Sequence, residues 1–349
     1  MLSICPIYAR EFKCLADACT DSCCIGWEIG IDEKTLEEYK SLDGKLAKRL
    51  SESINIRRGS AVFQLGADGR CPFLDCSGLC EIIKTTGQNA VPEICREHPR
   101  YYNVLSDRTE WGVGLSCEEA ARLILECRDI RVCHTAEEDA DGEECDRELE
   151  SFILFARERA FEILYGSELS LGERLSALLY YAEGLDGCIE GCDFGAFHPA
   201  FPLNCGKNLD TGMYLCGFRE VLKLFSEMDF LDRGFGEKLE KRALGSTPFP
   251  APTAHSELMI TRLTAYFLHR YFITAVFDEA VLPKVKFALV SALTVFALTK
   301  NCEDTEAWIN TAKAYSKEME YNEENRELFF EMCFTEPVLS TKNLISILT

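Results

Sequence analysis

The chain has 349 residues, enough for one large domain or two of ordinary size, and 47% of them are hydrophobic, so it can build a buried core. This composition excludes an intrinsically disordered or collagen-like chain. There are 37 lysines and arginines against 58 aspartates and glutamates, which gives a net charge of −21. Binding to a nucleic-acid backbone requires a basic surface, so a nucleic-acid partner is disfavoured.

Cysteine is the residue type whose usage departs most from the ordinary. The chain has 19 cysteines, and ten of them lie between Cys5 and Cys117. The start, MLSICPIYAREFKC, shows neither the basic stretch nor the apolar run of a secretory signal, so we expect a cytoplasmic protein. In a reducing compartment, clustered cysteines hold metals or carry out redox chemistry more often than they form disulfides. An extracellular disulfide scaffold is the competing interpretation.

In chain order, the first third predicts short helices and strands. Asp32 is a suitable N-cap for an amphipathic helix over residues 33–54. Residues 54–65 alternate between apolar and polar side chains, which predicts short strands. The segments 101–105 and 108–115 alternate in the same way and predict a hairpin.

After Cys117 the apolar residues recur at spacings of three and four, which predicts that the rest of the chain is mostly helical. The apolar stretch Phe287–Leu298 is 12 residues long and is flanked by lysines, whereas a membrane span needs about 20 residues, so we expect a buried helix and no membrane partner. The other segments with a helical period are 117–127, 148–166, 171–185, 213–228 and 255–278.

Residues 137–150 contain nine acidic residues and one arginine, which is typical of a solvated linker. We therefore predict two domains, residues 1–135 as a cysteine-rich metal- or cluster-binding module and residues 136–349 as a helical domain. The expected fold class is mainly α, with a small cysteine-rich α+β module packed on a larger all-helical region.

The strongest chemical signal is the segment FKCLADACTDSCCIGW, which places Cys14, Cys19, Cys23 and Cys24 within eleven residues. Crowded thiolates repel one another, so such crowding is tolerable chiefly when a cation balances their charge or oxidation removes it. Zinc and iron–sulfur clusters both provide the cation. Further cysteines follow in the segments CPFLDCSGLCEI, CREHPR and GLSC.

The spacing of these cysteines leaves the metal open. The arrangement C-x3-C-C differs from C-x3-C-x2-C, the signature of radical S-adenosylmethionine enzymes, and C-x2-C pairs at zinc-finger spacing are missing. Ligands would therefore have to come from separated blocks of sequence. Disulfides and inert thiols stay open as alternatives.

The segments FKCLADACTDSCCIGWEIGID, CPFL, GLCEI, C-x2-HPR and GLSCEEAARLIL resemble the flagellin lysine-N-methylases of the FliB type, and more loosely the cysteine-rich proteins described as zinc- or iron-chelating. The resemblance implies transfer of a methyl group from S-adenosylmethionine to lysine amines of flagellin or another lysine-bearing protein. It also implies a 4Fe-4S cluster, with zinc as the alternative metal. The cysteines that match the family pattern are Cys14, Cys19, Cys23, Cys24, Cys71, Cys80, Cys95 and Cys117.

Two further positions are interpreted through the same resemblance. Cys5 and Cys76 fall outside the family pattern, and His98 stands where the family more usually has tyrosine, so we interpret it as a replacement for an aromatic residue. Arg100 lies in the same tripeptide and is the candidate for binding a cofactor carboxylate.

The sequence marks no catalytic base. A G-x-G-x-x-G motif after a predicted strand is missing, which disfavours a Rossmann methyltransferase. Arg262, Tyr266 and His269 share one side of the helix predicted over 255–278, and among so many apolar neighbours we expect a structural role for them. Two alternatives stay open: a non-enzymatic zinc- or iron-binding protein for metal handling or maturation, and a redox sensor with disulfides.

Overall fold

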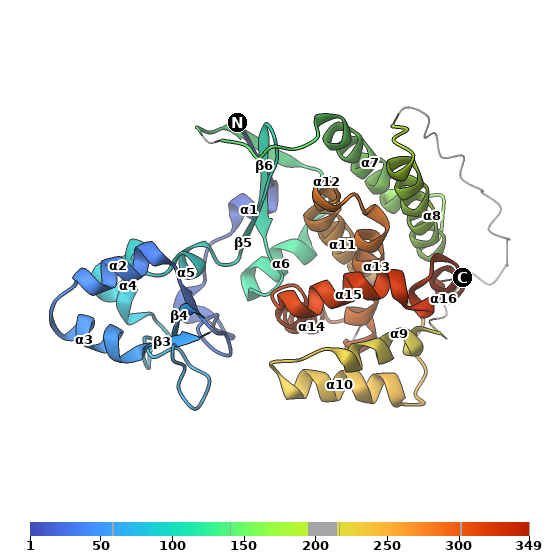
Figure 1. Cartoon of the computed structure of the whole chain (residues 1–349). Helices are drawn as coiled ribbons and strands as arrows, with labels where there is room; N and C mark the ends of the chain where they lie inside the picture. Colours follow the sequence, from blue (N-terminus) through green and yellow to red (C-terminus); the bar gives the residue numbers. More distant parts are fainter. Residues whose placement is uncertain (58, 140, 195–214, 216, 301, 349) are drawn as a thin grey trace.

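The computed structural model describes the chain except for residues 58, 140, 195–214, 216, 301 and 349. Figure 1 shows a smaller lobe that contains α2 to α5 and a larger helical lobe, with β5, β6 and α6 between them. Each lobe has its own cluster of buried apolar side chains. The mainly α fold class expected from the sequence is confirmed.

The smaller lobe is built on a three-stranded antiparallel sheet in the order β2-β4-β3. The predicted strands over residues 54–65 are confirmed as the hairpin of β3 and β4. The elements of this lobe are β2 (Gly30–Ile31), α2 (Glu33–Ser41), α3 (Gly44–Ser53), β3 (Ile54–Arg57), β4 (Ser60–Phe63), α4 (Glu81–Thr86) and α5 (Glu93–Glu97), with the short 3-10 helix η2 (Gln88–Ala90).

The single helix predicted over residues 33–54 is wrong, because the chain breaks between α2 and α3. Asp32 caps α2 as expected, accepting a hydrogen bond from the backbone N–H of Thr35 at 2.9 Å. The break falls at Leu42 and Asp43, and Gly44 opens α3 with φ of +89°, a backbone conformation that favours glycine. Periodicity alone could not show this turn, because both helices place apolar residues on the same core.

A second sheet lies between the lobes and has the strand order β5-β6-β1-β7. Its strands are β1 (Leu2–Pro6), β5 (Arg100–Val104), β6 (Arg108–Val113) and β7 (Cys133–Glu137). The predicted hairpin is confirmed as β5 and β6. The sequence analysis did not predict β1, which runs parallel to β6, or β7, which pairs antiparallel with β1. These pairings bring the first residues of the chain beside segments more than 100 residues later.

The larger lobe packs its helices around α13 (Val281–Leu298), which is buried on nearly all sides. Four of the predicted helical segments match α6, α7, α8 and α9, although part of the segment 213–228 lies outside the described residues. The remaining helices of this lobe and of the central region are α1 (Ile7–Glu11), α6 (Glu118–Glu126), α7 (Arg147–Tyr165), α8 (Leu171–Glu190), α9 (Phe218–Leu224), α10 (Arg233–Leu244), α11 (Ala254–Tyr271), α12 (Ala275–Asp278), α14 (Thr305–Met319), α15 (Glu323–Thr335) and α16 (Thr341–Leu348), with the short 3-10 helices η1 (Ala16–Ala18), η3 (Phe225–Glu227), η4 (Phe272–Thr274) and η5 (Pro337–Leu339).

The continuous helix predicted over residues 255–278 is wrong in its length, because α11 ends at Tyr271 and η4 separates it from α12. By contrast, the buried apolar helix predicted at Phe287–Leu298 is confirmed within α13. By length and composition α13 passes the test for a membrane span, with a mean hydropathy of 1.8, but 89% of that window is buried inside the protein. This burial is what the central helix of a core requires.

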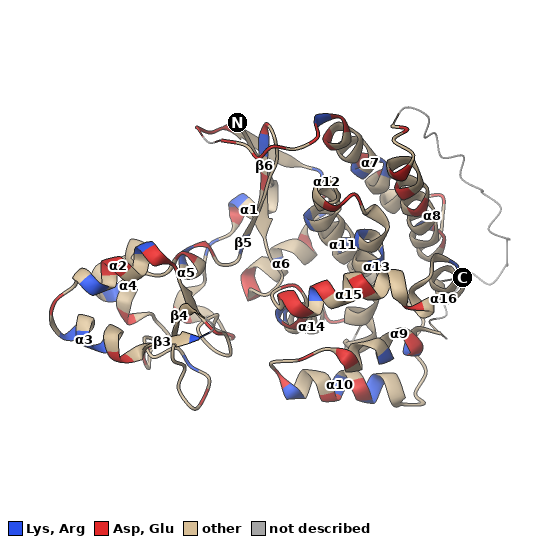
Figure 2. Cartoon of the chain, viewed as in Figure 1, with Lys and Arg blue, Asp and Glu red and all other residues tan. Residues whose placement is uncertain are grey.

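Acidic side chains occur on helices of both lobes, for example on α2 and α15 (Figure 2). The negative charge predicted from the composition is therefore spread over the chain. It does not by itself single out one face for a partner.

The loop from Cys14 to Trp27 connects the two lobes. Asp21 forms ion pairs with Lys317 at 2.7 Å and Lys313 at 3.3 Å, and both lysines belong to α14. Thr20 donates hydrogen bonds to Glu118 at the start of α6, 3.0 Å from its backbone nitrogen and 2.5 Å from its hydroxyl. The cysteine-rich loop is thus fixed against the helical lobe, while the chain that follows it enters the smaller lobe.

Candidate functional site

A cavity of about 500 Å³ opens where the cysteine-rich loop, the smaller lobe and the start of α6 meet. Its walls come from the loop before β2, from β4, from α4 and α5, and from the N-terminal end of α6. Much of the lining is apolar, including Phe12, Ile29, Phe63, Ile82 and Val91. The cavity therefore has a hydrophobic wall, and cysteine side chains also line it.

All eight cysteines singled out in the sequence line this one cavity. Their polypeptide segments are far apart, and the fold brings them together because the loop, the smaller lobe and α6 share the cavity wall. Cys5 is buried in β1 and Cys76 is exposed, and neither lines the cavity. The cavity-lining cysteines are Cys14, Cys19, Cys23, Cys24, Cys71, Cys80, Cys95 and Cys117.

Every cysteine in the part of the chain that the structure describes is a free thiol. A disulfide scaffold is therefore not observed at the described positions. Within the same described residues, no three histidine, cysteine, aspartate or glutamate side chains are grouped closely enough to hold a metal ion. The thiols surround the cavity, and a shared metal would require their sulfur atoms to move inward. Their role as metal ligands stays a prediction.

Backbone N–H groups stabilise the ionised form of several of these thiols. Cys80 and Cys117 are the N-cap residues of α4 and α6. Burial raises the pKa of Cys117 to about 11, while the nearby backbone N–H groups of Ala120 and Glu119 oppose that rise, although the side chain makes no capping hydrogen bond. The same opposition of burial and backbone donors acts on Cys80 and on Cys71, whose pKa is raised to about 11. The net shift of all three pKa values is upward, so burial outweighs the backbone donors.

Cys24 has the lowest pKa of the perturbed thiols in the cavity. The neighbouring Cys23 thiol lowers the pKa of Cys24, and Ser22 and Arg70 act in the same direction against burial. The same contact raises the pKa of Cys23. Among the perturbed thiols of the cavity, Cys24 is thus the one whose surroundings favour the ionised form, which is the form that binds metals.

His98 lies in an aromatic cluster at the rim of the cavity. Its ring centroid is 6.1 Å from that of Trp27 and 5.9 Å from that of Tyr321. Burial, together with the positive charge of Lys317, lowers the pKa of His98 to about 4, so the ring is neutral at pH 7. This packing agrees with the interpretation of His98 as a replacement for an aromatic residue.

Arg100, the candidate cofactor-binding residue, lines the cavity at the start of β5. Its guanidinium lies over the ring of Phe12, 5.8 Å from the centroid. Among the described residues, no ion pair joins Arg100 to a carboxylate, whereas the neighbouring Arg96 contacts Glu97 at 3.4 Å. Arg100 is therefore the more available of the two cations for a carboxylate ligand.

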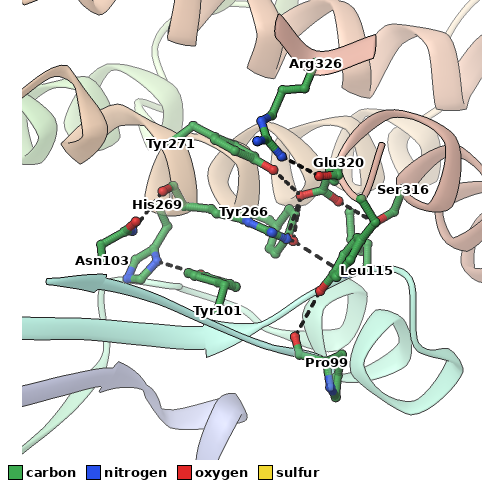
Figure 3. A network of polar contacts seen from close by, with 12 residues as sticks. Pro99, Tyr101, Asn103, Leu115, Tyr266, His269, Tyr271, Ser316, Glu320 and Arg326 are labelled. Carbon is green, nitrogen blue, oxygen red and sulfur yellow. Dashed lines mark hydrogen bonds and ion pairs between the residues drawn. The ribbon is translucent and has the colours of Figure 1, made fainter. Parts of the chain in front are cut away.

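A buried polar network supports the cavity wall from behind (Figure 3). Glu320 accepts hydrogen bonds from Tyr266 at 2.9 Å, Tyr271 at 3.2 Å and Ser316 at 2.6 Å, and it pairs with Arg270 at 3.0 Å. The network gives the fully buried Glu320 carboxylate its hydrogen-bond partners. Burying this charge without such partners would cost several kcal/mol of stability. Sequence analysis missed it, because Arg270 and Glu320 are 50 residues apart on helices that offer no local signal.

Tyr321 connects this network to the cavity, since its hydroxyl donates a hydrogen bond to the carbonyl of Pro99 at 3.1 Å and its ring contacts Trp27. Pro99 and Trp27 both line the cavity. A side chain added at Gly114 would collide with the Tyr321 hydroxyl, so glycine is needed there for close approach.

The structural role expected for the three polar residues of α11 fits their surroundings. His269 is buried and its Nδ1 lies 3.2 Å from the Tyr101 hydroxyl. Tyr266 belongs to the Glu320 network, and Arg262 donates a hydrogen bond to the carbonyl of Leu125. None of the three lines the cavity.

The fold and site thus define a mainly helical protein with a cavity lined by free thiols. Comparison with curated proteins finds a flagellar biosynthetic protein FliU from Salmonella muenchen, 30% identical over 126 residues that cover 34% of this chain and 75% of that protein. Two proteins named lysine-N-methylase, from Salmonella typhimurium and Salmonella choleraesuis, are each 28% identical over 126 residues. The chain belongs to the FliB-type lysine-N-methylase family, as its cysteine motifs led us to expect.

The match with the two lysine-N-methylases covers 31% of their length and 34% of this chain. No family model and no solved structure matches the chain. The relatives therefore define the family, and the structure described above supplies the arrangement of the cysteines.

Proposed function

We propose that the protein transfers methyl groups from S-adenosylmethionine to lysine side chains of a protein, in the bacterial cytoplasm, with flagellin as the expected substrate. The relatives named lysine-N-methylase and flagellar biosynthetic protein support a methyl transfer to protein lysines. The observation that carries the proposal is the single cavity lined by eight free cysteines, because a cavity of this size can admit a cofactor beside a metal.

The donor set of the cavity fits a 4Fe-4S cluster, with zinc as the alternative. Thiolates are soft ligands that bind iron–sulfur clusters and zinc, and no oxygen-rich set of ligands is needed for either. Three or four of the eight cavity cysteines would hold the metal. An iron with one position free of thiolate would bind the amino and carboxyl groups of S-adenosylmethionine, and Arg100 would pair with that carboxylate.

The apolar wall of the cavity addresses the main chemical obstacle to lysine methylation. Only a neutral amine can attack a methyl group, and deprotonating a lysine of ordinary pKa at pH 7 costs about 4 to 5 kcal/mol. A hydrophobic environment disfavours the charged ammonium and so lowers this cost. Phe12, Phe63 and Ile82 provide such an environment.

The test is a methylation assay with the anaerobically reconstituted protein, S-adenosylmethionine and flagellin. We expect lysine-containing peptides of flagellin to gain the mass of one or more methyl groups. The matched control is the variant Cys76→Ser, because Cys76 is exposed and does not line the cavity. A protein with its metal bound that never transfers a methyl group to flagellin or to another lysine-bearing protein would contradict the proposal.

A second candidate is a non-enzymatic zinc- or iron-binding protein for metal handling or maturation. It is favoured by the limited match, since more than two thirds of the length of each lysine-N-methylase lies outside the aligned region. Visible absorbance distinguishes the metals, because zinc is colourless and an iron–sulfur cluster is coloured. Bound metal with no methyl transfer would favour this candidate.

A further inference from the structure

A groove of about 430 Å³ lies on one face of the sheet between the lobes, outside the cavity described above. We call it the sheet groove. Its floor is formed by β5 and β6, which lie between the two lobes in Figure 1, and by the adjacent β1. Alternate residues of a strand share one face of a sheet. The residues of these strands that line the sheet groove are Ser3, Arg100, Tyr102, Val104, Thr109 and Trp111.

Two aromatic side chains lie side by side in the sheet groove. Tyr102 of β5 is directly opposite Trp111 of β6 in the strand register. The Trp111 Nε1 donates a hydrogen bond to the Ser3 hydroxyl at 3.2 Å, and the Tyr102 hydroxyl donates one to Glu97 at 2.8 Å. The polar ends of both side chains are thus bonded within the protein. Their rings are left to contact whatever occupies the groove.

The face of β5 that carries Tyr102 is open, whereas its other face belongs to the core. Tyr102 is 48% exposed, and Trp111 is half-buried. By contrast, Tyr101, the residue before Tyr102, is buried in the core of the helical lobe. Tyrosine and tryptophan side chains that stay partly exposed are typical of surfaces that bind another protein.

The rim of the sheet groove is negatively charged. Glu138 and Asp141 line the groove, and both are exposed. The amino group of Met1 donates a hydrogen bond to the backbone carbonyl of Glu138 at 2.9 Å, which fixes the acidic segment beside β1. Within the part of the chain that the structure describes, neither carboxylate forms an ion pair. Both charges are therefore available to a partner.

The sheet groove adjoins the cysteine-lined cavity. Arg100 lines both of them. Its guanidinium lies over the ring of Phe12, which lines the cavity and not the groove, so its positive charge lies on the cavity side. From Arg100, β5 continues to Val104, about 13 Å away at about 3.3 Å per residue. A peptide segment bound along the groove can therefore place a neighbouring residue in the cavity.

Aromatic rings beside carboxylates form a surface that suits a basic side chain. The face of an aromatic ring attracts a cation, and a carboxylate pairs with one. A lysine side chain combines a charged ammonium group with an apolar stem of four carbons, so it can contact the rings and the carboxylates together. An acidic or phosphorylated segment would be repelled by the same rim. The charge of the rim therefore selects a basic segment.

We propose that the sheet groove binds a lysine side chain of the substrate protein while a neighbouring lysine of the same segment enters the cavity. The inference rests on the proposed function for the identity of the partner, a protein that presents lysines. It adds the surface that selects among those lysines. Because the groove extends about 13 Å along β5, the two lysines should lie within about four residues of each other.

The first test measures peptide binding to the full-length protein by fluorescence anisotropy. The two labelled peptides are about ten residues long and differ only in having two lysines or two glutamines. Trp111→Ala should weaken binding of the lysine peptide about fivefold and leave that of the glutamine peptide unchanged. Equal affinity of the unaltered protein for both peptides, or an equal effect of the substitution on both, would overturn the proposal.

A second variant tests the charge of the rim without disturbing the sheet. Glu138→Gln combined with Asp141→Asn changes two exposed side chains, and it should weaken the lysine peptide and reduce the salt dependence of its binding. The matched control combines Glu37→Gln with Glu38→Gln, which removes the same charge from exposed positions on α2. Equal weakening by both pairs of substitutions would mean general attraction to an acidic protein and would overturn the proposal.

Sedimentation of the unaltered chain tests whether a second copy of the chain occupies the sheet groove. We expect Trp111→Ala to leave the sedimentation behaviour unchanged. A dimer that this substitution dissociates would assign the groove to a second copy and overturn the proposal.

A methylation assay separates failure of this inference from failure of the proposed function. With a peptide that has two neighbouring lysines, Trp111→Ala should raise KM about fivefold and leave kcat unchanged. With a peptide that has a single lysine, it should change neither. Lysine binding that depends on Trp111, without any methyl transfer, would support the inference and contradict the enzyme activity. Methyl transfer with a KM that does not depend on Trp111 would support the activity and overturn the inference.

Discussion

The two lobes are stabilised in different ways. The core of the helical lobe surrounds α13 and contains buried ion pairs, such as those of Arg157 with Glu110 and of Arg270 with Glu320. The core of the smaller lobe consists of ten buried residues, one of which is Cys71. Small cores usually need a disulfide or a metal to be stable. The comparison shows a large core with buried ion pairs in the helical lobe and a small core in the other lobe, so we expect the proposed metal to matter most for the stability of the smaller lobe.

The largest expected effect is therefore the loss of metal. Structural metal binding contributes on the order of 10 kcal/mol to the folding of small metal-bound domains. We expect a chelator to unfold the smaller lobe while the helical lobe stays folded. Hydrogen exchange followed by mass spectrometry would show fast exchange in α2 to α4 and slow exchange in α11 and α13. Equal loss of protection in both lobes would contradict the comparison.

The buried ion pair of the helical lobe gives the next largest effect. Arg157 contacts Glu110 through two hydrogen bonds, of 2.6 and 2.8 Å, and both side chains are buried. Removing one partner of such a pair costs about 3 to 5 kcal/mol, so Glu110→Ala should lower the free energy of unfolding by that amount. Urea unfolding measures it. As a control, Glu162→Ala breaks an exposed pair with Arg159 and should have little effect.

The same pair predicts how stability depends on pH. Burial raises the pKa of Glu110, but Arg157 outweighs this and lowers the pKa to about 2 from an ordinary 4.5. Since the folded pKa is below the unfolded one, the stabilisation is complete above pH 4.5 and is lost as the pH falls towards 2. Thermal unfolding between pH 6 and pH 3 should show a steeper loss for the unaltered chain than for Glu110→Gln.

A smaller effect is expected where the cavity wall meets the helical lobe. Gly114 has no room for a methyl group beside the Tyr321 hydroxyl, so Gly114→Ala should displace Tyr321 and weaken its hydrogen bond to Pro99. Overpacking of this kind costs about 1 to 3 kcal/mol. Thermal unfolding would measure it. Gly187→Ala is the matched control, because a methyl group there meets open space.

The smallest effect is expected from replacing His98. Its ring packs between Trp27 and Tyr321, so His98→Tyr should keep the aromatic cluster and leave the metal content unchanged. Tyrosine is larger than histidine, but His98 is only half-buried, so we expect a cost at the lower end of the about 1 to 3 kcal/mol typical of overpacking. Elemental analysis decides the point. A large loss of metal in this variant would show that the histidine is a ligand.

Features of the fold that depend on local periodicity could be predicted from the sequence, whereas features that depend on turn geometry or long-range pairing could not. The mainly helical class and the β5–β6 hairpin could be predicted, because they depend on local periodicity. The break at Gly44 and the pairing of β1 with β6 and β7 could not, since turn geometry and long-range pairing leave no local pattern. The eight cysteines were found from their crowding and from the family resemblance, but their convergence on one cavity depends on long-range packing that leaves no local pattern.

The sheet between the lobes has a consequence for how the chain is made. Since β1 pairs with β6 and β7, this strand has no partner until the residues of β6, up to Val113, have left the ribosome. In the same way, Cys14 is synthesised before Cys117, which lines the same cavity. During translation the cysteines of the loop from Cys14 to Trp27 are therefore present before the other walls of the cavity have been synthesised. Protection of these thiols from oxidation in that interval must come from the surrounding solution.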